Sequence, residues 1–230
     1  MKSVALFDLD GTLVDADHLH YQAWREMLLS QGQDVTVQAY RNQFMGAPND
    51  LILSRILPHM DRATGLALIE QKEALFRRLA TRLEPAPGLL AFLSWLEQHG
   101  VAVGVVTNAP RANAEQELRG IGLEHHFATL VIGEDLPFAK PHPLPYLTGL
   151  ERLKGRARTS IAFEDSLSGI ASARAAGLAV VGLATGLGEE RLLAEGATLA
   201  IPHFADPRLI PFVTQRLGLE FVLPSTNAVS

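Results

Sequence analysis

Short apolar segments alternate with helical patterns along most of the chain. Five segments rich in β-branched residues and a weaker sixth are predicted to form buried parallel strands. In chain order they are Val4–Phe7, Ala102–Val106, Thr129–Ile132, Ser160–Phe163, Ala179–Gly182 and, as the weakest, Thr198–Ile201. Helical patterns lie between them, at about Gly88–Gln98, Pro110–Gly120, Pro143–Leu153 and Ser166–Ala176. This alternation predicts an α/β fold with a doubly wound, mostly parallel sheet and helices on both faces.

One long helical stretch interrupts this alternation. Residues 16–84, which lie between the first two strands, carry apolar positions at helical spacing. Because a connection between neighbouring strands rarely needs so much chain, we expect a small α-helical cap inserted after the first strand. The prolines and the glycine of Pro85–Gly88 mark the return to the sheet. The core domain would then comprise 1–15 and 85–223, and the small polar residues of 224–230 would form a flexible tail.

Composition narrows the functional classes. The 230 residues are 47% hydrophobic and 20% charged, which excludes wholesale disorder. A net charge of −5 argues against a nucleic-acid binder, and the absence of cysteine excludes thiolate metal sites and cysteine nucleophiles. Asp8 interrupts the first apolar run long before it reaches the length of a signal or membrane-spanning segment. We therefore expect a cytoplasmic protein with no nucleic-acid or membrane partner. A monomer is the default expectation, since the sequence does not indicate an oligomeric state.

Acidic residues follow two of the predicted strands. Asp8, Asp10 and Gly11 come at the end of the first, and Glu164 and Asp165 at the end of the fourth. Turns favour Asp and Gly, and acidic residues often precede helices, so each motif alone also fits an ordinary turn or helix cap. Parallel strands, however, end at one edge of the sheet, where ligands of open α/β sheets bind. We expect these carboxylates to converge there.

Carboxylates that converge need a counter-charge. Two of them about 4 Å apart repel by roughly 4 kcal/mol at an effective dielectric constant of about 20. Three such pairs would rival the whole stability of a domain, which is about 5–15 kcal/mol. Because the chain offers oxygen ligands at this edge, and neither cysteine nor clustered histidine, a hard divalent ion fits best. The sequence therefore predicts a Mg²⁺ cofactor.

Two further polar groups follow predicted strands. Thr107 and Asn108 come after the second strand, and Lys140 lies in a proline-flanked loop beyond the third. Taken alone, a strand threonine or a loop lysine carries little information. With the carboxylates, they complete a set suited to phosphoryl transfer onto an aspartate: a carboxylate nucleophile, a second carboxyl group for proton transfer, Mg²⁺ and donors for the phosphoryl oxygens.

These motifs resemble those of the haloacid-dehalogenase superfamily of phosphohydrolases, and within it the branch of β-phosphoglucomutases and sugar phosphatases. The order of the motifs and their placement after strands both agree with that superfamily. The four are Asp8-Leu9-Asp10-Gly11-Thr12, Val106-Thr107-Asn108, Lys140-Pro141 and Glu164-Asp165. The resemblance implies a Rossmann-like core with a cap after the first strand, and a Mg²⁺-dependent phosphatase that acts on a small phosphorylated metabolite.

The same resemblance assigns roles. Asp8 would attack phosphorus and form an aspartyl-phosphate, and Asp10 would protonate the leaving oxygen and then activate water. Mg²⁺ would be bound by Asp8, by the carbonyl of Asp10 and by Asp165. Glu164 would lie behind these ligands and support them without binding the ion itself. The phosphoryl oxygens would be held by Gly11, Thr107, Asn108 and Lys140. Because Asp10 supplies the proton that an ester needs, phosphatase activity is favoured over dehalogenation.

The predicted cap adds candidate substrate contacts. His20 lies in a segment that resembles the corresponding part of β-phosphoglucomutase, and could approach Asp10 when the cap closes. The segment around Gly46 and Asn49 resembles the substrate-specificity loop of that cap. The mutases carry an arginine where Asn49 stands, and arginine suits a second phosphate, so simple hydrolysis is favoured. Arg55 lies further along and could substitute for it, which leaves the mutase as an alternative.

A non-enzymatic alternative is a phospho-receiver signalling module. Receivers also gather acidic residues, a threonine, a lysine and Mg²⁺ at strand ends. They are much shorter, have no helical insertion, and carry the phosphorylated aspartate on an internal strand rather than the first. The size of the insertion at 16–84 and the position of Asp8 argue against this alternative.

Overall fold

The computed structural model describes residues 2–44 and 49–219 and contains one parallel sheet. Its strands run in the spatial order β3-β2-β1-β4-β5-β6. Their bounds are β1 (Lys2–Phe7), β2 (Ala102–Thr107), β3 (Leu130–Ile132), β4 (Gly155–Glu164), β5 (Ala179–Leu183) and β6 (Leu199–Ile201). The chain first builds outward from β1 to β3, then crosses over to β4 and builds the other half. The predicted doubly wound α/β fold is thus confirmed.

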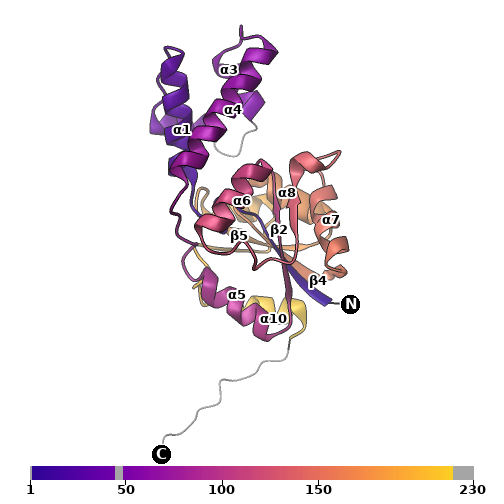
Figure 1. Ribbon diagram of the computed structural model, residues 1–230. Helices are drawn as coiled ribbons and strands as arrows, with labels where there is room; N and C mark the ends of the chain where they lie inside the picture. The colour runs from indigo at the N-terminus through magenta and orange to yellow at the C-terminus, as the bar shows by residue number, and fades with distance from the viewer. Residues whose placement is uncertain (1, 45–48, 220–230) are drawn as a thin grey trace, which may run out of the picture.

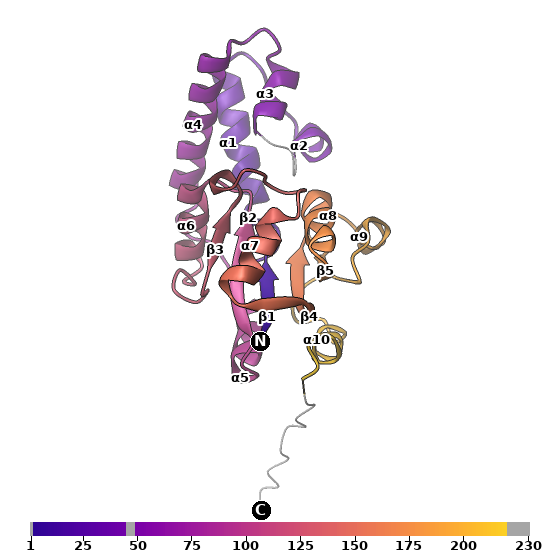
Figure 2. The same ribbon diagram turned by 90° about the vertical axis from the view of Figure 1, so that its right-hand side faces the viewer.

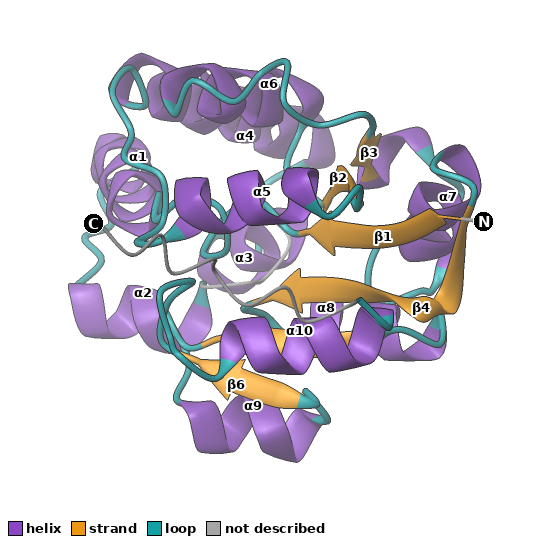
Figure 3. Cartoon of the chain, turned by 90° about the horizontal axis from the view of Figure 1, so that it is seen from below, coloured by secondary structure: helices purple, strands orange, loops and turns teal. Residues whose placement is uncertain are grey.

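Helices cover both faces of this sheet, as buried strands require. One face packs against α5 (Leu89–Gln98), α6 (Arg111–Gly120) and α10 (Leu209–Leu217). The other packs against α7 (Leu144–Arg152), α8 (Leu167–Ala175) and α9 (Glu189–Glu195). Figure 3 shows α5 and α10 beside strands β1 and β4.

The central strand β1 is buried on both of its faces. Ala5 and Phe7 belong to the apolar cluster beneath α5 and α10, whereas Val4 and Leu6 belong to the cluster on the opposite side. Phe7 also stacks on Phe163 of the neighbouring β4, with ring centroids 4.5 Å apart. A strand with no solvent-facing side explains why the sequence here is a continuous apolar run. It also fixes the position of the residues that follow β1.

In the described residues, four helices lie between β1 and α5, and we call them the inserted helices. They are α1 (Asp17–Ser30), α2 (Val37–Gln43), α3 (Asn49–Ile56) and α4 (Arg62–Leu79). The Thr36 hydroxyl caps α2 and the Asp61 carboxylate caps α4, each by accepting a backbone N–H bond. These helices share their own apolar cluster, which includes Trp24 and Leu68. They stand above the sheet in Figure 1, and the strands point toward them in Figure 2.

Three elements differ from the expectations. The strand predicted at Ser160–Phe163 is longer, because β4 begins at Gly155 with a half whose residues alternate between partly buried and exposed. Helices α9 and α10 were not predicted. The residues 224–230 and Gly46 lie outside the described part of the chain. None of the described helices is both long enough and apolar enough to cross a membrane.

Candidate active site

The motif residues meet because the strands that carry them are neighbours. Strand β1 lies between β2 and β4, with Phe7 opposite Val105 on one side and Phe163 on the other. Asp8 follows β1 directly, and its backbone N–H donates to the carbonyl of Phe163. Thr107 and Glu164 end the two flanking strands at the same edge. The pairing of these strands therefore brings the motif residues together at the carboxyl edge of the sheet, as predicted.

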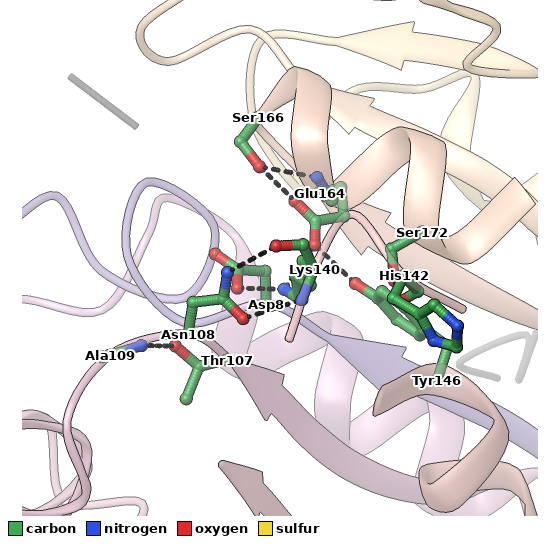
Figure 4. A network of polar contacts seen from close by, with 11 residues as sticks. Asp8, Thr107, Asn108, Ala109, Lys140, His142, Tyr146, Glu164, Ser166 and Ser172 are labelled. Carbon is green, nitrogen blue, oxygen red and sulfur yellow. Dashed lines mark hydrogen bonds and ion pairs between the residues drawn. The ribbon is translucent and has the colours of Figure 1, made fainter. Parts of the chain in front are cut away.

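Lys140 lies at the centre of this edge (Figure 4). Its Nζ donates to Asp8 Oδ1 and to Glu164 Oε1, both at 2.5 Å, and its side chain is only 2% exposed. Tyr146 from α7 donates its hydroxyl to the same Glu164 oxygen at 2.6 Å. Burial alone would lower the pKa of Lys140, but Asp8 and Glu164 outweigh it and raise that pKa. The lysine is thus held as a cation between two carboxylates.

Asn108 fixes the backbone of this lysine. Its side-chain oxygen accepts the backbone N–H of Lys140, and its amide nitrogen donates to the carbonyl of Lys140, each at 3.1 Å. A Cβ atom on Gly133 would stand 2.6 Å from that side-chain oxygen, so only glycine leaves room for the asparagine. Thr107 accepts the backbone N–H of Ala109 through its hydroxyl oxygen at 2.9 Å. Both side chains were predicted as phosphate ligands, and that role stays a prediction.

Three carboxylates form one group at this edge. Oxygens of Asp8, Glu164 and Asp165 all lie within 4.8 Å of one another. Burial and the neighbouring Glu164 raise the pKa of Asp8 to about 7, against the opposing effect of Lys140. Burial, followed by Asp8 and Glu164, raises the pKa of Asp165 well above its ordinary value. The single ammonium of Lys140 therefore leaves negative charge at this group uncompensated.

This donor set suits a hard divalent cation. All of its ligand atoms are oxygens, which Mg²⁺ prefers, and the excess negative charge favours a cation. Gly11 lets the first motif approach Asp165 closely, because a Cβ there would lie 2.2 Å from a carboxylate oxygen. Gly11 also has a φ of 70°, which other residues rarely adopt. The residues present thus fit the predicted Mg²⁺.

Asp10 lies in a second group, away from the three carboxylates. Its Oδ1 is 3.2 Å from Nε2 of His20 on α1, and Lys72 Nζ on α4 is 3.0 Å from the other imidazole nitrogen. Because the lysine can only donate, the neutral imidazole donates its Nε2–H to Asp10. Burial alone would raise the pKa of Asp10, but the hydrogen bond that His20 donates helps to lower it. Helices α1 and α4 therefore reach the predicted proton-transfer residue directly.

Glu117 from α6 completes the second group. Its carboxylate lies within 4.8 Å of the ligand atoms of Asp10 and His20, and its side chain is completely buried. Neither of its oxygens receives a hydrogen bond from a donor in the described residues. Burial and the charge of Asp10 raise the pKa of Glu117 well above its ordinary value.

Glu73 ties the inserted helices to the core. This buried carboxylate on α4 accepts bonds from Lys72 at 2.9 Å, from Asn49 at 2.6 Å and from Asn113 on α6 at 2.5 Å. Arg77, one turn further along α4, donates to the Asn113 side-chain oxygen at 3.0 Å. Asn49, predicted as a substrate contact, is therefore bonded to Glu73 in the structure.

Sequence reasoning missed four polar residues of the groups around Asp10 and Glu73, as well as Tyr146 beside Glu164. The four lie among the buried residues of α4 and α6: Lys72, Glu73, Asn113 and Glu117. A charged residue within the apolar stripe of a helix was the available signal. The stripe alone does not say which partner such a residue meets, because the partners come from another part of the chain.

Comparison with known proteins agrees with the motifs. Residues 5–183 match the family model of haloacid dehalogenase-like hydrolases. The chain is 29% identical to a phosphorylated carbohydrates phosphatase of Thermotoga maritima, over 85% of this chain and 92% of the relative. It is 30% identical to a phosphoglycolate phosphatase of Yersinia pestis, over 90% of this chain and 91% of the relative.

A solved structure agrees at the level of the fold. The β-phosphoglucomutase of Clostridium difficile superposes with a TM-score of 0.81 at 22% identity, covering 95% of this chain and 98% of the mutase. The match extends through both the sheet and the inserted helices, since nearly the whole chain is covered. The chain belongs to the haloacid dehalogenase-like hydrolases, as its four motifs predicted.

Proposed function

We propose that this hydrolase cleaves the phosphate monoester of a small sugar or polyol through an aspartyl-phosphate on Asp8. The observation that carries the proposal is the different surroundings of the two motif aspartates. Asp8 lies against Lys140 and the acidic group, whereas Asp10 lies against His20. Two carboxyl groups in different surroundings suit two roles, one as nucleophile and one as proton donor and acceptor.

The chemistry follows from these surroundings. An oxygen of Asp8 attacks phosphorus as the bond to the ester oxygen breaks, and protonated Asp10 donates its proton to the departing alkoxide. Ionised Asp10 then takes a proton from a water molecule, which attacks the aspartyl-phosphate and releases inorganic phosphate. Lys140 offsets negative charge beside Asp8 throughout. Mg²⁺, held by Asp8, Asp165 and the Asp10 carbonyl, would supply further positive charge to the phosphoryl oxygens.

Relatives and local contacts support a monophosphate substrate. The two relatives named above act on phosphorylated carbohydrates and on phosphoglycolate. A mutase must bind a second phosphate, yet the Asn49 amide is bonded to the carboxylate of Glu73, which repels one. Arg55 is exposed on α3, on the surface of the inserted helices. Hydrolysis is therefore favoured over transfer between two positions of a sugar.

A panel of phosphorylated metabolites with Mg²⁺ tests this proposal. Steady release of inorganic phosphate, with the highest kcat/KM for sugar or polyol phosphates, is the expected result. Conversion of β-glucose 1-phosphate to its isomer in the presence of catalytic bisphosphate, without free phosphate, would instead identify a mutase. Labelling of one equivalent of protein without sustained turnover would indicate a receiver. The Asp8→Asn variant serves as the inactive control.

A further inference from the structure

The unpartnered carboxylate of Glu117 is the feature of the site that the proposed mechanism does not use. Buried carboxylates in proteins are paired or hydrogen-bonded, and one that is neither calls for an explanation. Glu117 is 0% exposed, and neither of its oxygens accepts a hydrogen bond from a donor in the described residues. Its place between Ala114 and Leu118, which pack in the apolar core, would suit an apolar residue better. The carboxylate is therefore not explained by folding.

Glu117 faces the side of the site where the ester oxygen leaves. Its carboxylate lies within 4.8 Å of both the Asp10 carboxylate and the His20 imidazole. Asp10 is the group proposed to protonate the leaving oxygen. A group bonded to the carbon next to the ester carbon lies within about one hydrogen-bond length of that oxygen. Glu117 is thus placed to meet the first substituent of the leaving alcohol.

The donors on neighbouring residues bond to groups other than Glu117. Lys72 Nζ donates to His20 and Glu73, and the amide of Asn113 donates to Glu73. Asp10 can share at most one proton with Glu117, and this leaves acceptor positions on both carboxyl groups without a donor. The missing donor must come from a molecule that enters the site.

We infer that Glu117 is a substrate-binding residue that accepts a hydrogen bond from a hydroxyl group next to the phosphate ester. This rests on the proposed phosphatase function and narrows its substrate class to phosphorylated polyols and sugars with a vicinal hydroxyl. A methyl group at that position leaves the acceptor without a donor. A carboxylate there, as in phosphoglycolate, brings acceptor oxygens but no donor, and it would have to give up its water beside two buried carboxyl groups. The enzyme should therefore prefer esters with a hydroxyl group at this position, then those with hydrogen or methyl, and last those with a carboxylate.

Three small esters test the inference: 2-hydroxyethyl phosphate, ethyl phosphate and 2-phosphoglycolate. For the wild-type enzyme with Mg²⁺ we expect kcat/KM to be about fivefold higher for 2-hydroxyethyl phosphate than for ethyl phosphate, which matches one ordinary hydrogen bond. Phosphoglycolate should be the poorest of the three. In Glu117→Leu the ratio between the first two esters should fall close to one, whereas Glu117→Gln, which keeps an acceptor oxygen, should retain part of it.

Glu115→Gln is the matched control, since Glu115 lies on the same helix but is exposed and pairs with Arg111. This variant should keep the wild-type ratio. Three outcomes would each overturn the inference but leave the proposed phosphatase function intact. They are equal kcat/KM of the wild type for the first two esters, a preference of the wild type for phosphoglycolate, and an unchanged ratio in Glu117→Leu. Absence of turnover on every ester would instead refute the proposed function. If Glu117→Leu fails to fold, the ratios of the wild type and Glu117→Gln decide.

Discussion

Lys140 Nζ lies 2.5 Å from Asp8 Oδ1, and both groups are buried at the carboxyl edge of the sheet. The two residues are 132 positions apart in the chain, so this contact exists only in the folded protein. The ammonium compensates part of the negative charge that Glu164 and Asp165 impose on Asp8. Lys140 therefore opposes the rise that burial causes in the pKa of Asp8, so that the buried nucleophile can ionise near neutral pH.

Replacing this lysine should cost both stability and activity. Lys140→Met leaves the carboxylates of Asp8 and Glu164 buried without their cation, and breaking a buried ion pair costs about 3–5 kcal/mol. The free energy of unfolding, from urea titration, should fall by that order, and phosphate release should be nearly lost. Lys154→Met, at an exposed lysine, is the control and should change stability by less than about 0.5 kcal/mol. An unaltered unfolding midpoint for Lys140→Met would contradict the pairing.

Removal of the nucleophile should abolish turnover. Asp8→Asn keeps the size of the side chain but replaces the attacking carboxylate with an amide, so no aspartyl-phosphate forms. Phosphate release from every ester should fall to the background rate, while circular dichroism shows a folded protein. Asp34→Asn, at an exposed aspartate paired with Arg25 on α1, should retain the wild-type rate. A near-native rate for Asp8→Asn would show that another group attacks phosphorus.

Loss of Asp10 should separate the two chemical steps. Asp10→Asn has no proton to give and no base for water, but p-nitrophenolate leaves without protonation. With p-nitrophenyl phosphate we expect one equivalent of p-nitrophenolate to appear in a burst, followed by slow hydrolysis of the phosphoenzyme. Rapid-quench kinetics measure both phases. A steady rate equal to that of the wild type, with no burst, would rule out Asp10 as the base.

Chelation of divalent metal should weaken activity and lower thermal stability. The group of Asp8, Glu164 and Asp165 carries more negative charge than Lys140 offsets, so a bound cation relieves repulsion. After exhaustive chelation, turnover should be weak and should return on addition of Mg²⁺. The melting temperature, measured without substrate, should rise with Mg²⁺ and fall again with chelator. Full activity without metal would refute the argument from carboxylate repulsion.

The sequence predicts features that depend on neighbouring residues in the chain and on strand direction. The buried run of β1 identifies a central strand, and parallel pairing then brings Asp8 and Glu164 to one edge. Contacts that depend on the angle between helices could not be predicted. Glu117 meets Asp10 and His20, and Glu73 meets Asn113, only because α6 packs near the first motif, α1 and α4.

The last prediction concerns Glu73, which links the inserted helices to the core. Burial alone would raise the pKa of Glu73, but the Lys72 ammonium and the Asn113 amide lower it below its ordinary value of 4.5. A carboxyl group whose pKa is lower in the folded state stabilises that state at pH values above 4.5, and loses this effect as the pH falls through the folded-state pKa.

Glu73→Gln should therefore destabilise the protein most near neutral pH. It removes the charge that pairs with buried Lys72, and we expect the free energy of unfolding to fall by about 1–3 kcal/mol at pH 7. As the pH drops below 4.5, the difference between wild type and variant should shrink, because protonated Glu73 no longer pairs with the lysine. Urea titrations across this pH range measure it. Glu70→Gln, at an exposed glutamate on the same helix, is the control. If the loss of unfolding free energy in Glu73→Gln did not vary with pH, the charge of Glu73 would not be what holds the helices together.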